Sequence, residues 1–230
     1  MHPENAGPLY YTLFSFISLI AAVILLKVMR REGQQDIKTT VLPFMILGAI
    51  IGAKLPVFLS YGFREEYILT GKSYFGALVG ALIASNIYKM VKKINGAFGD
   101  RFVVPLCVSA GLGKIGCSIY GCCGGTETDF FIRTKNYAGS YVHPAQIYES
   151  VFQFMCGIVF FYLYKTGKFK GLHFLVYLAA YSVFRFLIEF IRIEPRVLFG
   201  FTVYQVIAVL ILPFLILMIK RRINEPAIIH

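Results

Sequence analysis

The chain has 230 residues, of which 57% are apolar and only 15% charged, and it contains no Trp. Soluble domains average about 25% charged residues, so this composition, with a mean hydropathy of +0.68, excludes ordinary soluble, disordered, coiled-coil and collagen-like chains. It favours a helical bundle in a bilayer, where lipid-facing positions must be apolar. The net charge of +11 suggests nucleic-acid binding in a soluble protein, but in a membrane protein it is typical of basic cytoplasmic loops.

Seven apolar runs follow one another along the chain, and a helix needs about 20 residues to cross the hydrocarbon core. The weakest run carries Lys89 and has small residues four apart at Gly76, Gly80 and Ala84, which favours close helix packing. We therefore predict an all-α membrane protein, one polytopic domain over residues 1–230. Its seven predicted helices are Leu9–Leu26, Val41–Phe63, Tyr74–Val91, Phe102–Tyr120, Ile147–Tyr164, Leu172–Ile191 and Phe199–Ile219.

Basic residues predict the orientation. The N-terminus lacks the basic start of a signal peptide, and the first basic residues follow the first run, so we expect the N-terminus outside and the C-terminus in the cytoplasm. Short outer loops are then predicted at 64–73 and 121–146. Most Lys and Arg residues fall in predicted inner segments, namely Lys27, Arg30, Arg31, Lys38, Lys89, Lys92, Lys93, Arg101, Lys165, Lys168, Lys170, Lys220, Arg221 and Arg222.

Three basic residues lie within or at the margins of apolar runs: Lys54, Lys114 and Arg185. Even lenient insertion scales give each a cost of roughly 2.5–3.5 kcal/mol at mid-helix, so such residues usually face the bundle interior and pair. Glu149 and Glu189 are the candidate partners. Snorkelling to the interface is the alternative for the two lysines, whereas Arg185, well inside its run, indicates a functional site.

The sixth run carries Arg185, Glu189 and Arg192, spaced four and three apart. On one continuous helix these side chains share a face. Guanidinium groups bind phosphate well, so this face is predicted to bind a phosphate near the outer interface. The alternative is a structural ion pair between Arg185 and Glu189.

A second group opens the fifth run. We expect Pro144 at the first helical position and His143, Gln146 and Glu149, spaced three apart, on one face of the helix. Histidine is the side chain best suited to accept a proton near neutral pH. His143 is therefore a candidate base or substrate-positioning residue, oriented by Tyr148 and Glu149.

A third group is rich in glycine and cysteine, from Gly111 to Gly125. Glycines let a backbone approach a ligand or another helix closely. The cysteines Cys117, Cys122 and Cys123 do not follow a zinc-ligand pattern, and no metal is expected. Cys117 could form a disulfide with Cys122 or Cys123 on the oxidising side, or all three thiols could pack as small apolar groups.

These segments together resemble the prolipoprotein diacylglyceryl transferase family over most of the chain. Its His-Pro-x-Gln-x-Tyr-Glu motif is matched fully by residues 143–149, and its C-terminal Arg/Glu/Arg motif by Arg185, Glu189 and Arg192. Three weaker glycine-containing segments also resemble the family, namely Ile51–Leu55, Gly71–Leu78 and Gly113–Cys117.

The resemblance implies a multi-pass enzyme of the bacterial inner membrane, without a cofactor or nucleic-acid partner. Such an enzyme moves a diacylglyceryl group from phosphatidylglycerol to the lipobox cysteine of a prolipoprotein and releases glycerol phosphate. The implied catalytic residues are His143, Tyr148, Arg185 and Glu189. The implied substrate-binding residues are Lys54, Lys114, Gln146, Glu149, Arg192, Cys117, Cys122 and Cys123.

The sequence departs from the family's motifs at several positions. Phe75 stands where the family has a histidine, Lys54 and Lys114 where it has arginines, and Cys117 where it has an asparagine. Three alternatives therefore stay open: a paralogue with an acceptor other than a lipoprotein, a non-catalytic protein that binds anionic lipid, and a thiol-redox protein built on its cysteines.

Overall fold

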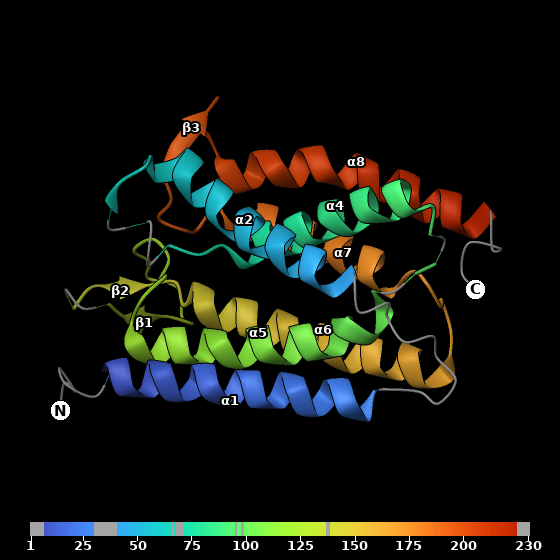
Figure 1. The fold of residues 1–230 in the computed structure, drawn as a ribbon. Coiled ribbons are helices and arrows are strands. Elements are labelled where there is room, and N and C mark those ends of the chain that lie inside the picture. Colours follow the sequence, from blue (N-terminus) through green and yellow to red (C-terminus); the bar gives the residue numbers. More distant parts are fainter. Residues whose placement is uncertain are drawn as a thin grey trace. The chain divides into compact units, whose positions relative to one another are not determined.

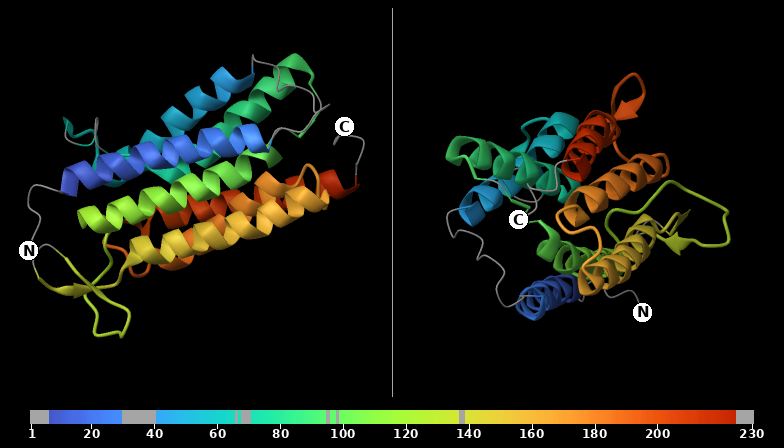
Figure 2. Two further views of the ribbon diagram at one scale, coloured as in Figure 1. Left: turned by 90° about the horizontal axis from the view of Figure 1, so that it is seen from below. Right: turned by 90° about the vertical axis from the view of Figure 1, so that its right-hand side faces the viewer.

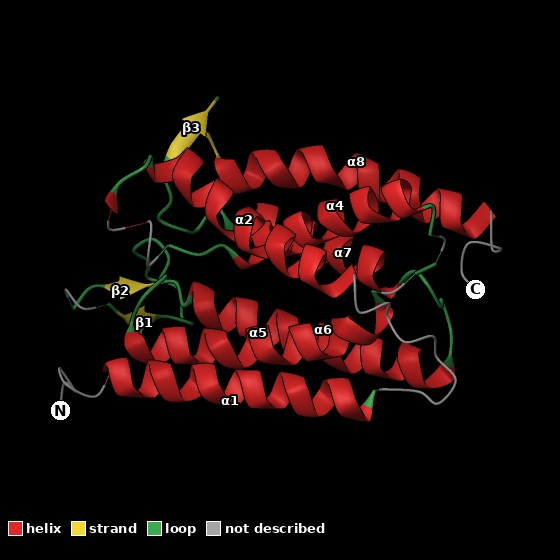
Figure 3. Ribbon diagram, in the orientation of Figure 1, coloured by secondary structure: helices red, strands yellow, loops and turns green. Residues whose placement is uncertain are grey.

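The computed structural model describes residues 7–29, 41–65, 67, 71–94, 96–97, 99–136 and 139–224. Two short hairpins accompany seven α-helices in these ranges, so the all-α, seven-helix prediction is confirmed (Figure 3). The helices are α1 (Gly7–Val28), α2 (Val41–Tyr61), α4 (Tyr74–Lys92), α5 (Asp100–Tyr120), α6 (Ala145–Thr166), α7 (His173–Ile188) and α8 (Val203–Asn224). The strands are β1 (Thr134–Lys135), β2 (Tyr141–Val142), β3 (Arg196–Leu198) and β4 (Phe201–Thr202).

Six of these helices are long and apolar enough to cross a membrane, and α7 is apolar but has only 16 residues. Side chains on their surfaces support a lipid environment, because Leu19 of α1 is 61% exposed and Leu210 of α8 is 71% exposed. Large apolar side chains are exposed at this level only where the solvent is hydrocarbon or a partner covers them. The chain is thus a multi-pass membrane protein. Its orientation stays a prediction, and the basic residues Arg30, Arg31 and Lys38 lie outside the described ranges.

Internal contacts divide the chain into two compact units. That residues 1–230 form one domain stays a prediction. The first unit holds α1, nearly all of α5, and α6, with the β1–β2 hairpin and residues 190–193. The second holds α2, α4, α7 and α8, with the β3–β4 hairpin.

In the first unit, α1, α5 and α6 run side by side (Figures 1 and 2). A Cβ added to Gly116 would lie 2.8 Å from the Cβ of Phe14 on α1, and one added to Gly111 would lie 2.9 Å from the ring of Phe154 on α6. The Ser150 hydroxyl of α6 donates to the carbonyl of Gly111, at 2.9 Å. Gly111 and Gly116 of α5 therefore serve close helix packing, one of the two roles predicted for the glycines of this segment.

In the second unit, α2 packs along α4 through facing glycines. A Cβ added to Gly76 would overlap the carbonyl oxygen of Gly52, and one added to Gly80 would overlap that of Gly48. Small residues at this spacing let two helix backbones approach closely in a membrane. The packing predicted for Gly76, Gly80 and Ala84 is confirmed, and its partner is α2.

The sixth and seventh predicted helices have different limits in the structure. α7 ends at Ile188 and α8 begins only at Val203, with the β3–β4 hairpin between them. Pro195 lies in this connection, and the residue before a proline is disfavoured in helical conformation. The connecting segment is therefore longer than the apolar pattern alone predicted.

Candidate functional site

Lys114 and Glu149 form a buried ion pair in the first unit. The Lys114 ammonium lies 2.8 Å from the Glu149 carboxylate, and the glutamate side chain is only 1% exposed. α5 supplies the lysine and α6 the glutamate. This confirms Glu149 as the partner of a basic residue at membrane depth, and Lys114 pairs instead of snorkelling.

His143 stands just before α6 and not on it. The helix begins at Ala145, with Pro144 as its N-cap, so the predicted first helical position for Pro144 is wrong. The predicted helical face of His143, Gln146 and Glu149 is wrong for His143, which lies outside the helix. The backbone of His143 instead pairs with residues 125 and 126: Gly125 donates to its carbonyl at 2.8 Å, and its own N–H donates to Thr126 at 3.0 Å. The His143 carbonyl also accepts from the N–H of Ala145 at 2.9 Å, so the backbone groups of His143 are used before the helix begins.

The imidazole of His143 is half-buried beside aromatic rings. Its ring centre lies 6.1 Å from that of Phe130 and 6.3 Å from that of Tyr148. Nδ1 is buried and has no hydrogen-bond partner among the described residues. The Tyr148 hydroxyl donates to the carbonyl of Ile132, at 3.2 Å, so it lies against the outer loop. An unsatisfied buried ring nitrogen is costly unless a ligand satisfies it.

Gln146 connects α6 to the cysteine segment. Its side-chain amide donates to the carbonyl of Cys122, while its Oε1 is buried without a partner among the described residues. The Cys122 thiol lies 3.6 Å from the carbonyl of Cys117. The amide thus fixes the chain that leaves α5, and its oxygen is a second unsatisfied group in this part of the unit.

The three cysteines of this segment are close together, and all are free thiols. Cys117 and Cys122 hydrogen-bond with Cys123, and these contacts, with Lys114 and Arg192 as nearby cations, lower the pKa of the Cys123 thiol. Hydrogen bonds with Cys117 and Cys123, followed by burial, raise the pKa of the Cys122 thiol. Cys123 is exposed and has a positive φ of 62°. Among the described residues, no His, Cys, Asp and Glu side chains are grouped to hold a metal ion.

Arg192 does not share a helical face with Arg185 and Glu189. α7 ends at Ile188, and Arg192 instead pairs its backbone with Gly125 in an isolated antiparallel bridge. A Cβ at Gly125 would overlap with the carbonyl of Ile191 at 2.6 Å and with the Cβ of His143 at 2.8 Å. Gly125 is therefore the residue that lets the 190–193 segment and His143 meet, which sequence reasoning had grouped only with the other glycines.

Arg185 and Glu189, whose pairing the sequence predicted, form a buried ion pair in the second unit. Their side chains lie 3.1 Å apart and are 6% and 0% exposed. The Arg185 guanidinium also lies 4.4 Å from the centre of the Tyr204 ring of α8, a cation–π contact. Sequence reasoning missed Tyr204, because nothing distinguishes this tyrosine from the other fourteen in the chain.

Lys54 and Phe75 are the remaining predicted positions of the second unit. The Lys54 ammonium donates to the carbonyl of Gly71 at 2.8 Å. It therefore binds the segment before α4, instead of snorkelling to the membrane interface. Phe75 is 1% exposed, and its ring makes an edge contact with Tyr181 at 5.7 Å. The position where the resemblance places a histidine is thus filled by an apolar ring.

Comparisons with known proteins agree with this picture. The sequence profile described as "Prolipoprotein diacylglyceryl transferase" matches residues 7–220. A phosphatidylglycerol–prolipoprotein diacylglyceryl transferase of Campylobacter jejuni is 31% identical over 228 residues, covering 85% of this chain and 80% of that protein. The corresponding protein of Clostridium tetani is 28% identical over 197 residues, covering 78% of this chain and 79% of that protein.

A third relative, the phosphatidylglycerol–prolipoprotein diacylglyceryl transferase 2 of Clostridium perfringens, is 33% identical over 129 residues. This match covers 53% of the chain, which spans half the length of that relative. The profile match extends over nearly the whole described chain, from the start of α1 to residue 220 in the last part of α8. The chain therefore belongs to the prolipoprotein diacylglyceryl transferase family.

Proposed function

We propose that this protein transfers a diacylglyceryl group from phosphatidylglycerol to an acceptor thiol, as the names of its relatives describe. The observation that carries the proposal is the unsatisfied Nδ1 of His143, just before α6, the helix that supplies Glu149 to the buried Lys114–Glu149 pair. A proton acceptor and a cation on neighbouring elements are what transfer to a thiol with a phosphate leaving group requires.

The proposed step is a displacement at carbon. The acceptor thiol gives its proton to His143, the sulfur forms a bond with the terminal glyceryl carbon of the diacylglyceryl group, and the carbon–oxygen bond to phosphate breaks. Glycerol phosphate leaves with one more negative charge than the phosphodiester carried. A cation stabilises that charge as it develops, and we assign this role to Lys114 and Arg192 of the first unit.

Burial supports the assignment of the cations. Lys114 is paired with the buried Glu149 carboxylate in the first unit, as Arg185 is with Glu189 in the second. Buried charges in a membrane protein are costly, and function is the usual reason for their presence. Tyr148 and Glu149 are proposed to position the reacting groups, Glu149 through Lys114.

The test is transfer by the purified protein in vesicles that contain labelled phosphatidylglycerol, with a lipobox cysteine peptide as acceptor. We expect glycerol phosphate release and a lipidated peptide, and a loss of at least about 100-fold in rate for His143→Ala, in line with general acid–base catalysis. Lys165→Gln is the matched control, because Lys165 is an exposed residue at the other end of α6. Normal transfer by His143→Ala contradicts the assigned base.

One observation favours a second candidate function, that of a non-catalytic protein that binds anionic lipid. Phe75 is a buried apolar ring at the position where the family resemblance places a histidine, and such a ring cannot transfer a proton. The same vesicles separate the two functions. Retained phosphatidylglycerol without glycerol phosphate release supports the second, whereas glycerol phosphate release without a lipidated peptide indicates a transferase with another acceptor.

A further inference from the structure

The second unit contains a basic pocket at the C-terminal ends of α4 and α8. Its volume is about 440 Å³, and its lining includes four cations: Lys89 and Lys93 from the end of α4, and Arg221 and Arg222 from the end of α8. Among the described residues that line it, none is acidic. Basic residues at a helix C-terminus are favourable for the helix itself, so the number of cations alone does not make a site.

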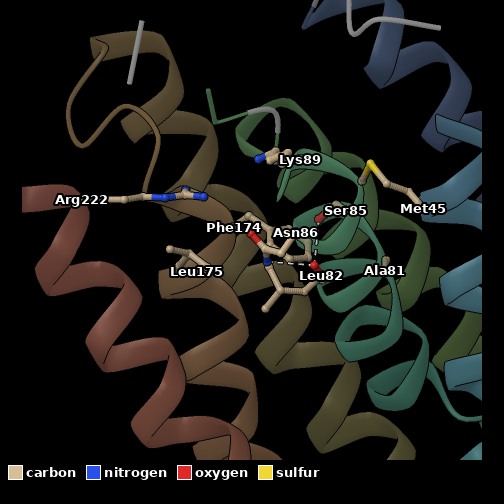
Figure 4. Close-up of a pocket in the computed structure, with 10 residues that line it drawn as sticks. Met45, Ala81, Leu82, Ser85, Asn86, Lys89, Phe174, Leu175 and Arg222 are labelled. Atoms are coloured by element: carbon tan, nitrogen blue, oxygen red, sulfur yellow. Dashed lines mark hydrogen bonds between the residues drawn. The ribbon is translucent and has the colours of Figure 1, made fainter. Parts of the chain in front are cut away.

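The arrangement of Lys89 and Arg222 distinguishes this pocket from an ordinary basic helix end. Both side chains also line a second, smaller pocket of about 30 Å³, whose lining includes Ser85 and Phe174 (Figure 4). They extend into it from α4 and α8, and their positive charges are close enough to repel each other. Two cations that line one partly apolar pocket favour the binding of an anion there.

Backbone carbonyls hold both cations in place. The Lys89 ammonium donates to the carbonyl of Gly96 at 2.8 Å, and the Arg222 guanidinium donates to the carbonyl of Gly171. Both acceptors are neutral backbone groups that orient the two side chains. Asp100 interacts electrostatically with Arg222, but its carboxylate also accepts a backbone N–H from His173, at 3.0 Å, and faces the imidazole of that residue.

The remaining wall is apolar. Met90 and Ile94 from the end of α4, together with Phe214 and Met218 from α8, complete the pocket. Met90 is 79% exposed. A cationic recess beside exposed apolar side chains at the end of membrane-spanning helices matches the chemistry of a phosphate head attached to acyl chains.

We propose that this pocket binds the phosphate group of an anionic lipid headgroup or of a soluble phosphate monoester, as a site separate from the residues assigned to transfer. Lys89 and Arg222 hold the phosphate oxygens, Lys93 and Arg221 line the pocket around them, and the apolar wall contacts the acyl chains when the ligand is a lipid. Lys89, Lys93, Arg221 and Arg222 were first used only to predict the membrane orientation. All four thus have a second proposed role in binding phosphate.

The test uses the absence of tryptophan from the chain. Phe214→Trp places a single fluorophore in the wall of the pocket, and the protein is reconstituted in phosphatidylcholine vesicles. Brominated phosphatidylglycerol at low mole fraction is expected to quench this fluorescence several times more than brominated phosphatidylcholine. Equal quenching by the two brominated lipids, with no effect of soluble glycerol phosphate, overturns the proposal. The readout requires no turnover, so it is independent of the proposed transferase activity.

Charge variants identify the residues that bind. In the Phe214→Trp background, Lys89→Gln with Arg222→Gln is expected to abolish most of the preference, because loss of each basic residue weakens the attraction to anionic lipid roughly fivefold. The matched control is Lys92→Gln with Lys220→Gln, which removes the same charge from the same helices outside the pocket lining. Equal losses in both pairs overturn the proposal.

Two further measurements complete the test. Lys93 is exposed and is expected to tolerate Lys93→Gln without loss of fold, so this single variant is measured beside the pair and is expected to weaken the preference as well. An unchanged preference in both Lys93→Gln and the folded pair overturns the proposal. Glycerol phosphate added to the vesicles separates the sources: relief of quenching supports a soluble phosphate ligand, and persistent quenching supports a lipid headgroup.

Discussion

At the scale of single residues, the buried charges of this chain are used in pairs. Lys114 with Glu149, and Arg185 with Glu189, each join a cation to a carboxylate that is almost fully buried. Taking such groups out of water is costly, and the cost is offset only while both partners are present. The same residues are therefore the ones whose substitution has the largest expected effect on folding.

A double-mutant cycle tests the first pair. Lys114→Met leaves Glu149 buried without its cation, and we expect a loss of about 3–5 kcal/mol in the free energy of unfolding. Lys114→Met with Glu149→Gln is expected to recover part of that loss, because no buried charge then stays uncompensated. Reversible unfolding in mixed detergent measures the double variant and the two single variants, Lys114→Met and Glu149→Gln. A double variant that is as unstable as the sum of the single variants contradicts the pairing.

Cys123 gives a prediction of pH dependence. Hydrogen bonds from Cys117 and Cys122, with the charges of Lys114 and Arg192, lower its pKa, so the reactive thiolate persists at lower pH than in an ordinary cysteine. We expect the rate of Cys123 alkylation by iodoacetamide to fall less between about pH 8 and 7 than that of an ordinary thiol, which with a pKa near 8.5 slows by almost tenfold.

Peptide mapping by mass spectrometry assigns the alkylation to Cys123. In Cys117→Ala with Cys122→Ala the side-chain hydrogen bonds to Cys123 are removed, so the rate is expected to fall more steeply as the pH is lowered. A tenfold decrease per pH unit in the unsubstituted protein contradicts the lowered pKa. A single disulfide among these three cysteines, found in the same experiment, supports instead the redox alternative.

At the scale of the elements, the glycine contact between α2 and α4 is the most demanding. Gly48 and Gly52 of one helix face Gly76 and Gly80 of the other, and an added Cβ at each position would meet backbone atoms. Backbone cannot yield as a flexible side chain can, so this pair of helices has little tolerance for a larger residue. It forms the wall on which Phe75 and Tyr74 of α4 are placed.

Gly52→Ala tests this contact. We expect it to destabilise the protein by about 1–3 kcal/mol, the usual cost of overpacking. Gly113→Ala is the matched control, since Gly113 is also helical but has no atom within 4 Å of an added Cβ. There we expect a gain of up to about 1 kcal/mol from helix propensity. Thermal unfolding in detergent measures both, and equal effects contradict the close packing.

At the scale of the whole molecule, the membrane orientation is the main prediction that remains to be tested. Six helices are long enough to span, and α7 with 16 residues is short for the hydrocarbon core. The distribution of Lys and Arg predicts that seven crossings place the N-terminus outside and the end of α8 inside. A crossing by α7 is necessary for this arrangement.

Cysteine labelling in intact cells tests the orientation. A membrane-impermeant maleimide is expected to react with Cys123, which is exposed in the predicted outer loop, and not with a cysteine introduced at Asn224, the last residue of α8. The Asn224→Cys variant is expected to react only after the cells are permeabilised. Labelling of both positions in intact cells contradicts an odd number of crossings between them.

Much of the site was predictable because it depends on local patterns. The apolar runs predicted seven helices, and the spacing of Arg185 and Glu189 predicted their ion pair, since residues four apart on a helix are neighbours wherever the helix lies. The pairing of Lys114 with Glu149 was foreseen only as one option, because a sequence does not state which faces of two helices meet.

Composition and apolar spacing by themselves determined that this is a helical membrane protein, and the motifs determined its family, because both depend only on the order of residues. Tertiary structure decided where the helices stop. It placed His143 and Arg192 outside the helices on which spacing had put them, because backbone pairing with Gly125 and Thr126 replaces helical hydrogen bonds there. It also decided that Lys89 and Arg222, 133 residues apart in the chain, line one pocket, since only the packing of α4 and α8 brings their ends together.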